Sequence, residues 1–318
     1  MKNKLFGMKK SKYINEAALL LMTLIWGATF VIVKQSLNDA SSMLFISMRF
    51  SLAGIILFFI LLYRKQKLIK EAVLPGIILG VVLFLTFATQ TIGLKYTTAT
   101  KSGFITGSCV VMIPIFQLII EKKTPRKGVS IGAVIVFIGI LFLSSRGNSL
   151  PNLLNEVGAN FNFGDGMTLM CAIFCAIYIV FIDIIAPKHD FWILLFAQIL
   201  VVAILSLIAS LVFKFTLIEP LRINFSPYLI FGVLYTGILS TLLTTAIQTK
   251  YQKFVSPAKA GIIYSFEPVF AAIYAFFLLK EKMSNFGLFG CALIFLGLIL
   301  SEVFDSNISN KGKLNGAG

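Results

Sequence analysis

Apolar residues occur along this chain in long runs, with short polar segments between them. Each run has about 20 residues, the length that an α-helix needs to cross the ~30 Å hydrocarbon layer of a bilayer. Backbone polar groups must be satisfied internally in lipid, so such runs predict helices and not strands. Ten of them are predicted to be transmembrane helices, near residues 16–34, 42–63, 73–94, 98–120, 128–144, 165–186, 191–213, 226–249, 257–279 and 284–304.

Composition leads to the same class of protein. Of the 318 residues, 58% are hydrophobic and 13% are charged, and the mean hydropathy is +0.93. A soluble domain would not stay in solution with these values. We therefore expect an all-α, multi-pass integral protein of the plasma membrane, in contact with lipid over most of its surface.

The formal net charge of +15 has two explanations, a polyanionic partner or membrane topology. With the N-terminus inside, 19 of the 28 Lys and Arg residues fall in cytoplasmic segments and eight fall in outer segments. This bias follows the positive-inside rule and predicts that both termini are cytoplasmic. It explains most of the positive excess, so we expect no nucleic-acid partner.

Motifs for catalysis or cofactor binding are missing from the sequence. It has no phosphate-binding glycine loop, no serine elbow and no HExxH, and we expect neither an enzyme nor a cofactor. Cys171 and Cys175 share a helical face, but zinc needs further His or Cys ligands, and His189 is alone in the chain. Cys109 and Cys291 also fall in predicted helices, so all four thiols are interpreted as packing residues, and no metal site is predicted.

The chain repeats itself at an offset of 158 residues. "LTFATQTIGLKYTTATKSGFI" from Leu85 lies over "LTTAIQTKYQKFVSPAKAGII" from Leu243 without a gap, and nine of 21 positions are identical. Hydrophobicity does not explain the polar matches, which are Thr86 with Thr244, Gln90 with Gln248, and Lys101 with Lys259. The same offset superposes Gly132 on Gly290 and Gly139 on Gly297.

Ten helices in two equal units give five per unit, and an odd number forces the second unit into the membrane in the opposite sense. We predict two inverted five-helix repeats around a central cavity, residues 1–150 with a cytoplasmic N-terminal tail and residues 151–318 with a cytoplasmic C-terminal tail. Inverted repeats of this kind are typical of secondary transporters, whose binding site lies near the midplane. Matched residues then approach the axis from opposite sides, which makes Gln90 and Gln248 a candidate pair.

Helical spacing places several polar and aromatic residues on stripes that could line such a cavity. The candidates on stripes are Thr86, Gln90, Gln117, Thr244, Gln248 and Tyr264, and Trp26 and Tyr178 lie inside the first and sixth predicted helices. Ser102, Thr106 and Cys109 are on the stripe of Gln117. The alternative for the Thr and Gln residues is interhelical hydrogen bonding, worth roughly 0.6 kcal/mol each. For Trp26 and Tyr178 the alternative is packing.

Glu267 and Pro268 stand in the middle of the apolar run 257–279. Ten residues after Pro257, Glu267 lies about 15 Å into the helix, near the bilayer midplane. A charge there costs about 2.5–3.5 kcal/mol unless it is paired, protonated or hydrated, and a proline opens a kink. Glu267 is therefore a candidate to contact substrate or to carry a coupling proton, and the alternative is a fixed hydrogen bond or structural ion pair.

Two further charged residues belong to predicted helices. Arg49 is about seven residues into the second helix, and we expect it to snorkel or to brace a neighbouring helix through backbone carbonyls rather than to bind substrate. Asp165, in "FGDGM", is expected to be an N-cap.

The chain resembles the EamA-like family of the drug/metabolite transporter superfamily over nearly its whole length. The resemblance lies in "WGATFVIVK", "GFITGSCVVMIPIF", "GDGMTLMCAIFCAIYIV" and the stretch from "SPAKAGIIYSFEPVFAAIYAFFLLKEKMS" onward. It implies two inverted five-helix repeats, alternating access and transport, often export, of amino acids, related compounds or toxic organic molecules. The first half departs from this pattern, since "MIPIFQ" has Pro114 with no glutamate before it, which favours a single carboxylate site.

These observations favour a secondary transporter of a small polar or amphipathic metabolite, such as an amino acid. Multidrug or lipid-like efflux is an alternative, because 31 Phe permit an apolar cavity wall. A further alternative is a membrane receptor or partner protein that does not transport. Substrate, direction, coupling ion and oligomeric state do not follow from the sequence.

Overall fold

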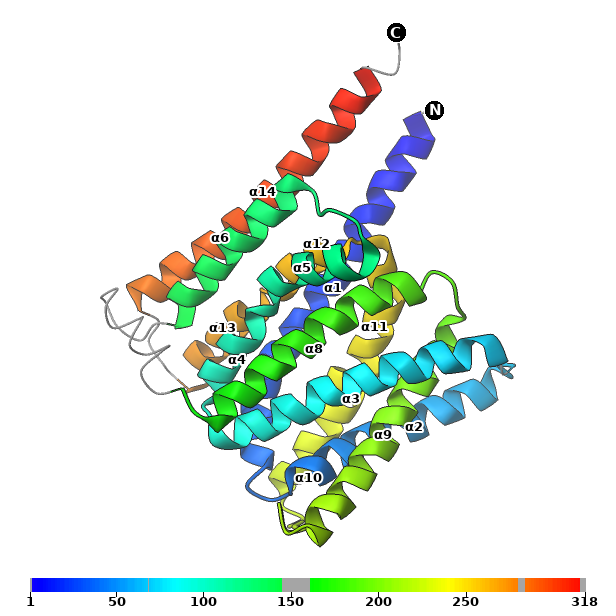
Figure 1. Cartoon of the computed structure of the whole chain (residues 1–318), viewed down its shortest axis with the longest axis vertical. Coiled ribbons are helices and arrows are strands. Elements are labelled where there is room, and N and C mark those ends of the chain that lie inside the picture. The colour runs from blue at the N-terminus through cyan, green and yellow to red at the C-terminus, as the bar shows by residue number, and fades with distance from the viewer. Residues whose placement is uncertain (1, 68, 145–160, 280–283, 315–318) are drawn as a thin grey trace.

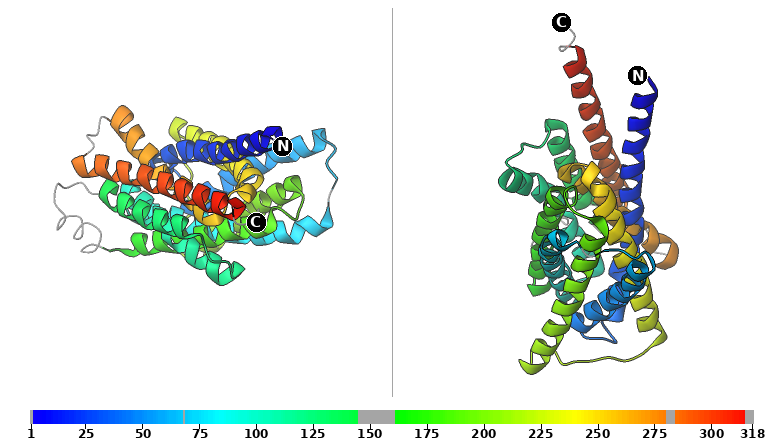
Figure 2. Two further views of the ribbon diagram at one scale, coloured as in Figure 1. Left: turned by 90° about the horizontal axis from the view of Figure 1, so that it is seen from above. Right: turned by 90° about the vertical axis from the view of Figure 1, so that its right-hand side faces the viewer.

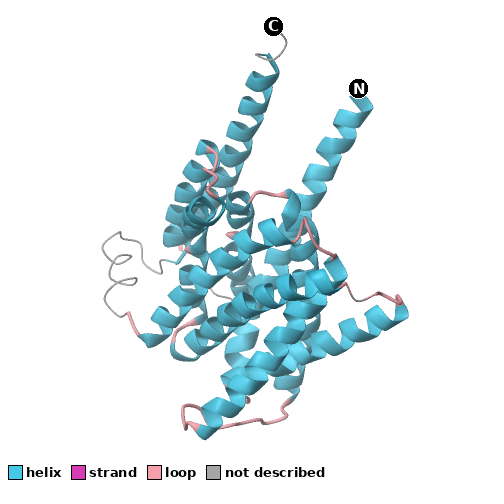
Figure 3. Ribbon diagram, turned by 45° about the vertical axis from the view of Figure 1, so that its right-hand side comes forward, coloured by secondary structure: helices cyan, strands magenta, loops and turns pink. Residues whose placement is uncertain are grey.

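A computed structural model describes residues 2–67, 69–144, 161–279 and 284–314, and within these ranges the chain is helical with no β-strand (Figure 1, Figure 3). Before residue 145 the helices are α1 (Lys2–Ser36), α2 (Ser42–Tyr63), η1 (Lys70–Ala72), α3 (Val73–Tyr96), α4 (Ala99–Gly107), α5 (Cys109–Glu121) and α6 (Lys127–Ser144). After residue 160 they are α8 (Phe163–Ile185), α9 (Phe191–Phe215), α10 (Pro227–Leu234), η2 (Tyr235–Leu243), α11 (Thr244–Tyr251), η3 (Gln252–Phe254), α12 (Pro257–Tyr264), α13 (Glu267–Leu279) and α14 (Asn285–Leu314).

Within the described ranges, seven helical stretches are long and apolar enough to cross a membrane, and two shorter apolar helices cover residues 127–143 and 285–301. The seven stretches are Tyr13–Ser36, Ser42–Tyr63, Lys70–Tyr96, Lys101–Glu121, Phe163–Ile185, Phe191–Phe215 and Pro227–Phe254. The protein is therefore a multi-pass membrane protein. The predicted boundary between residues 150 and 151 lies outside the described residues.

Three of the expected helices are interrupted. The run 98–120 was expected to be one helix, but it is divided at Ser108, whose hydroxyl donates to the Ile105 carbonyl at 2.6 Å. Serine side chains compete for backbone acceptors in this way and bend helices. The run 226–249 contains the π-helical segment η2, a form of helix that often occurs at functional sites. The run 257–279 is interrupted at Ser265 and Phe266, so that Pro268 lies in the first turn of α13, where its missing N–H costs nothing.

Glycines allow two helices to touch along their backbones. α6 packs along α14, where a Cβ added at Gly139 would lie 2.8 Å from the carbonyl oxygen of Gly290 and one added at Gly132 would lie 2.7 Å from that of Gly297 (Figure 1). The N-terminal part of α1 and the C-terminal part of α14 project from the same end of the molecule (Figure 2).

Large apolar side chains cover the outer surface, as on α9, where Ile204 and Ile208 are about half exposed. Inside, buried apolar residues form one large cluster around α5, α6, α8 and α12, a second around α2, α3 and α9, and a small third around the ends of α1 and α3. The cavity described below is lined by members of all three clusters, so it lies where they meet.

Candidate binding cavity

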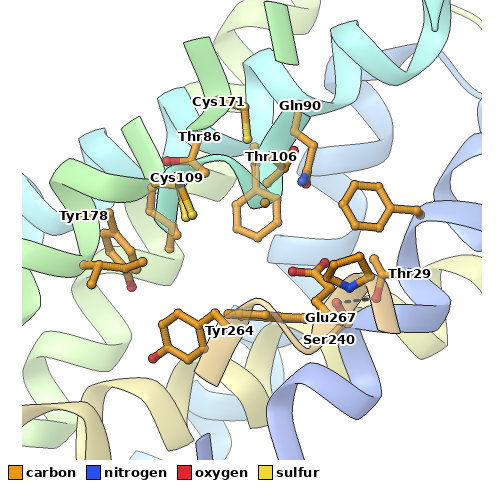
Figure 4. Close-up of a pocket in the computed structure, with 18 of the residues that line it drawn as sticks. Thr29, Thr86, Gln90, Thr106, Cys109, Cys171, Tyr178, Ser240, Tyr264 and Glu267 are labelled. Atoms are coloured by element: carbon orange, nitrogen blue, oxygen red, sulfur yellow. Dashed lines mark hydrogen bonds between the residues drawn. The ribbon is translucent and has the colours of Figure 1, made fainter. Parts of the chain in front are cut away.

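A cavity of about 90 Å³ lies inside the bundle. One water molecule needs about 10–15 Å³ of such space, so the cavity has room for several waters or a small organic molecule. The polar and aromatic side chains that line it come from α1, α3, α4, α8, η2, α11, α12, α13 and the break before α13, and several are labelled in Figure 4. The polar or charged ones are Thr29, Thr86, Gln90, Thr106, Ser240, Gln248, Ser265 and Glu267, with Trp26, Tyr178 and Tyr264 among the aromatic residues.

Glu267 is the only charged side chain among the described residues that line the cavity. It is half-buried and is the first residue of α13, directly after the break at Ser265 and Phe266. In Figure 4 its carboxylate points toward the open space between the labelled side chains. No described residue donates a hydrogen bond to this carboxylate or forms an ion pair with it.

Aromatic rings form much of the wall near Glu267. The rings of Trp26 and Tyr264 meet edge to face, with centroids 5.6 Å apart. The Trp26 indole donates to the Thr244 hydroxyl at 3.2 Å, and the Tyr264 hydroxyl donates to the Gln252 side chain at 2.9 Å. These bonds satisfy the polar tips, so a ligand in the cavity meets the apolar surface of the two rings.

Arg49 lies behind the wall, where it does not snorkel but takes the second expected role and braces a neighbouring segment. Only 1% of its surface is exposed, because it is enclosed by η2 and α3 rather than near a helix end. Its Nε donates to the Thr241 hydroxyl at 2.9 Å, and its guanidinium lies 4.7 Å from the ring centroid of Phe87. It braces η2 through side-chain hydroxyls, since Nη2 also lies 3.5 Å from the Ser240 hydroxyl.

Seven of the nine site residues suggested by the sequence line the cavity: Trp26, Thr86, Gln90, Tyr178, Gln248, Tyr264 and Glu267. Thr244 does not, but it holds Trp26 in place from behind. Gln117 lies elsewhere on α5, 3.5 Å from Glu121. No hydrogen bond joins Gln90 to Gln248, whose amide instead donates to Gln252 at 2.9 Å.

Sequence reasoning missed several lining residues. Thr29 donates to Ser240 at 3.0 Å, which joins α1 to η2 at the cavity wall. Cys171 and Cys175, interpreted from the sequence as packing residues, also line the cavity, as does Cys109, which helical spacing had placed on the stripe of Gln117. The signal that was available is the i, i+4 spacing of Cys171 and Cys175 with Tyr178 three residues later, which puts one face of α8 on the cavity.

One buried ion pair joins the start of α4 to the start of α8. Lys101 Nζ lies 2.6 Å from Asp165 Oδ2, and the Asp165 side chain is fully buried. Thr97 also donates to Asp165, at 2.6 Å. The N-cap of α8 is Asn162 and not Asp165 as expected, because Asp165 is the third helical residue and closes a capping box onto the Asn162 backbone.

A second ion pair joins the start of α12 to α1. Lys259 Nζ lies 2.6 Å from Glu16 Oε1, and the Lys259 side chain is 4% exposed. The two pairs lie at opposite ends of the apolar part of α1, Tyr13–Ser36, since Lys34, 18 residues after Glu16, donates to the Thr97 carbonyl beside Asp165. At 1.5 Å per residue these ends are about 27 Å apart, close to the thickness of a bilayer core.

Comparison with known proteins adds a family. A model of the EamA-like transporter family matches residues 15–145 and again residues 162–302. An uncharacterized transporter of Archaeoglobus fulgidus is 30% identical over 285 residues, which cover 90% of this chain and 84% of the relative. A shorter match, 30% identical over 142 residues, covers 41% of this chain and 44% of an S-adenosylmethionine/S-adenosylhomocysteine transporter of Chlamydia muridarum.

The fold also has a counterpart among solved structures. One crystal structure superposes with a TM-score of 0.73 at 16% identity, and the superposition covers 94% of this chain and 99% of the other. At this identity the likeness shows a common fold and nothing about substrate.

Proposed function

This chain belongs to the EamA-like transporter family, and we propose that it is a secondary transporter that moves a small polar or amphipathic metabolite across the plasma membrane by alternating access. The observation that carries the proposal is the central cavity, lined by both halves of the chain and lying between two buried ion pairs. We propose further that ten helices cross the membrane as two inverted repeats, residues 1–150 and 151–318.

The contact between α6 and α14 supports the inversion. Gly132 corresponds to Gly290 and Gly139 to Gly297 at the repeat offset, while the close contacts join Gly132 to Gly297 and Gly139 to Gly290. A two-fold axis between the halves converts each of these contacts into the other, as in an isologous interface. The two matches of the family model, one in each half, are consistent with the same division.

The two short helices α4 and α12 are the proposed gates. Each begins with an ion-paired lysine at its third residue, Lys101 or Lys259, and each ends in a break, at Ser108 or Ser265. Each ion pair joins one half of the chain to the other. Since the cavity-lining end of each short helix lies about 7.5 Å beyond its lysine, opening one ion pair and bending at the adjacent break would expose the cavity on one side only.

Several side chains are proposed to contact substrate in the cavity. Glu267 provides the charge, and it either binds the substrate directly or carries a coupling proton. Gln90, Gln248 and Thr86 offer hydrogen-bonding groups, and Trp26, Tyr178 and Tyr264 offer ring surface. Thr244 is assigned a positioning role through Trp26, and Gln117 is assigned none in the cavity.

The relatives leave the substrate open. The transporter of Chlamydia muridarum is named for S-adenosylmethionine and S-adenosylhomocysteine, both of them amphipathic amino-acid derivatives, and it matches less than half of this chain. An amino acid or amino-acid derivative agrees with a cavity that combines rings, amides and one carboxylate. Efflux of apolar drugs is the second candidate, favoured by the aromatic wall.

A ligand screen tests this proposal. The purified protein is heated in the presence of amino acids, nucleosides, polyamines, sugars and lipophilic cations, because a ligand at 100 times its Kd adds about 2.7 kcal/mol to stability. A ligand found in this way should exchange across proteoliposomes that contain the protein, and Glu267→Gln and Gln248→Ala should weaken both effects. Stabilisation without exchange would favour a receptor over a transporter.

A further inference from the structure

We infer that the substrate presents a positively charged organic group, an ammonium or a comparable onium centre attached to an apolar portion, to Glu267. This inference rests on the proposed function and adds the charge of the substrate to it. It draws on three features of the cavity: the isolation of its one charge, the rings beside that charge and the polarity of the helix end on which the charge stands.

The carboxylate of Glu267 lacks a partner within the described part of the chain. The ion pairs at the two ends of the bundle hold Lys101 and Lys259 away from it, each 2.6 Å from another acid. Arg49 does not line the cavity, and the Phe87 ring, which does, lies against its guanidinium at 4.7 Å. An ionised carboxylate in a mostly apolar site requires a counter-charge or donor, and a cationic ligand would supply it here.

The walls around Glu267 fit an organic cation better than a bare metal ion. Among the described residues, no group of three or more His, Cys, Asp or Glu side chains is placed to hold a metal. By contrast, the five aromatic side chains of the wall are Trp26, Phe30, Phe87, Tyr178 and Tyr264. Ring faces attract ammonium-type cations through their quadrupoles, most strongly where water is excluded.

Glu267 is the first residue of α13, and this position offsets part of the cost of an ionised side chain there. The first N–H groups of a helix carry a partial positive charge, which stabilises a negative side chain in the first turn. The same N–H groups would stabilise the carboxylate when it pairs with a cationic ligand. An anionic substrate would meet repulsion from this group, and a neutral one would leave it unpaired.

Four probes that share a phenylethyl group and differ in charge test the inference: 2-phenylethylamine, phenylalanine, 3-phenylpropionate and 2-phenylethanol. Binding to the purified full-length protein is measured by calorimetry and by the shift in Tm at neutral pH. We expect the amine to bind at least tenfold more tightly than the alcohol and the propionate. The zwitterion should fall between the amine and the propionate.

Two substitutions place the effect at Glu267. Glu267→Gln keeps the shape and removes the charge, so the amine and the alcohol should bind with similar Kd values, while Glu267→Asp should keep the preference for the amine. Unaltered Tm values of both unliganded variants show that folding is intact. Equal binding of amine and alcohol to the natural protein, a preference that survives Glu267→Gln, or no binding of any probe would each overturn the inference.

Failure of this inference is distinguishable from failure of the proposed function. A protein that exchanges a neutral or anionic ligand across proteoliposomes is still a transporter, and only the charge assignment is then wrong. A protein that binds the amine with the expected preference but exchanges nothing has the charge site without the transport activity.

Discussion

The substitution Asp165→Asn tests whether the Lys101–Asp165 ion pair opens during transport or stays formed in every conformation. It removes the negative partner of Lys101 but keeps an oxygen that can accept from the Asn162 backbone in the capping box. Breaking a buried ion pair by removing one partner costs about 3–5 kcal/mol. The Lys101 side chain is 21% exposed and regains some hydration, so we expect the lower limit, about 3 kcal/mol.

If this ion pair opens during transport, the substitution destabilises conformations that are closed at the Lys101 end. Conformations open at that end keep their free energy, because the ion pair is already broken in them. A difference of about 3 kcal/mol changes the ratio of the two populations roughly 100-fold, because about 1.4 kcal/mol corresponds to a factor of ten. The population open on the side opposite the termini should increase by that factor. If the ion pair never opens, the substitution would instead lower the stability of every folded conformation equally.

Cys109 is a natural reporter of this opening because it lines the cavity. With Cys171, Cys175 and Cys291 replaced by alanine, a membrane-impermeant maleimide is added to one face of sealed vesicles and the labelling rate of Cys109 is measured. Asp165→Asn should raise the rate from the face opposite the termini by up to about 100-fold, the population ratio given above. From the other face, labelling should not increase.

Two comparisons complete the experiment. Glu16→Gln, at the other ion pair, should raise labelling from the face of the termini. Lys95→Gln removes an ion pair to Glu219 in which Lys95 is 37% exposed, a pair worth at most about 1 kcal/mol, and should leave labelling unchanged. If Asp165→Asn lowers the Tm but changes labelling from neither face, or raises it equally from both, the gating argument is refuted.

Three further substitutions test particular contacts. Gly290→Ala places a Cβ 2.5 Å from a carbonyl oxygen of α6 and should lower the Tm, at a cost of about 1–3 kcal/mol in stability. In the control Gly103→Ala the Cβ would lie 3.7 Å from the nearest ring atom, so this change should be tolerated. Equal effects of the two substitutions would contradict the contact between α6 and α14. Arg49→Lys should also lower the Tm, because an ammonium does not reproduce the guanidinium's reach to two hydroxyls and its stacking on a ring; an unchanged Tm would show that charge alone matters. Tyr264→Phe removes the hydroxyl that donates to Gln252 and should cost about 0.5–1.5 kcal/mol of stability, while ligand binding in the cavity persists. If the variant loses ligand binding but not stability, the hydroxyl contacts the ligand instead.

Much of the candidate site was accessible from the sequence because polar residues stand out in apolar runs. Glu267 and Gln90 were found in this way, and both line the cavity. The rule fails for polar residues whose partners lie on other helices. Thr244 looks like Gln248 in the repeat, yet its hydroxyl accepts from Trp26 behind the wall, and nothing in the local sequence tells the two positions apart.

Arg49 shows that the surroundings of a charged residue are equally hard to predict from the sequence. Its place seven residues into a helix suggested that it either reaches the interface, which lipid favours for an isolated helix, or braces a neighbouring helix through backbone carbonyls. The structure surrounds it instead with the hydroxyls of Ser240 and Thr241. Snorkelling is favoured only when no protein partner satisfies the guanidinium, and those partners come from a segment nearly 200 residues away in the chain.

The sequence alone determined that this protein crosses the membrane repeatedly, and it indicated the related halves, because length, hydropathy and repetition are properties of residues in order along the chain. Tertiary structure decided where the helices break, which thiols and hydroxyls face the cavity, and how Lys101 and Lys259 find acids in the opposite half. These features depend on contacts between helices. In lipid, where apolar surface does not distinguish one helix face from another, shape and hydrogen bonding between partners determine those contacts.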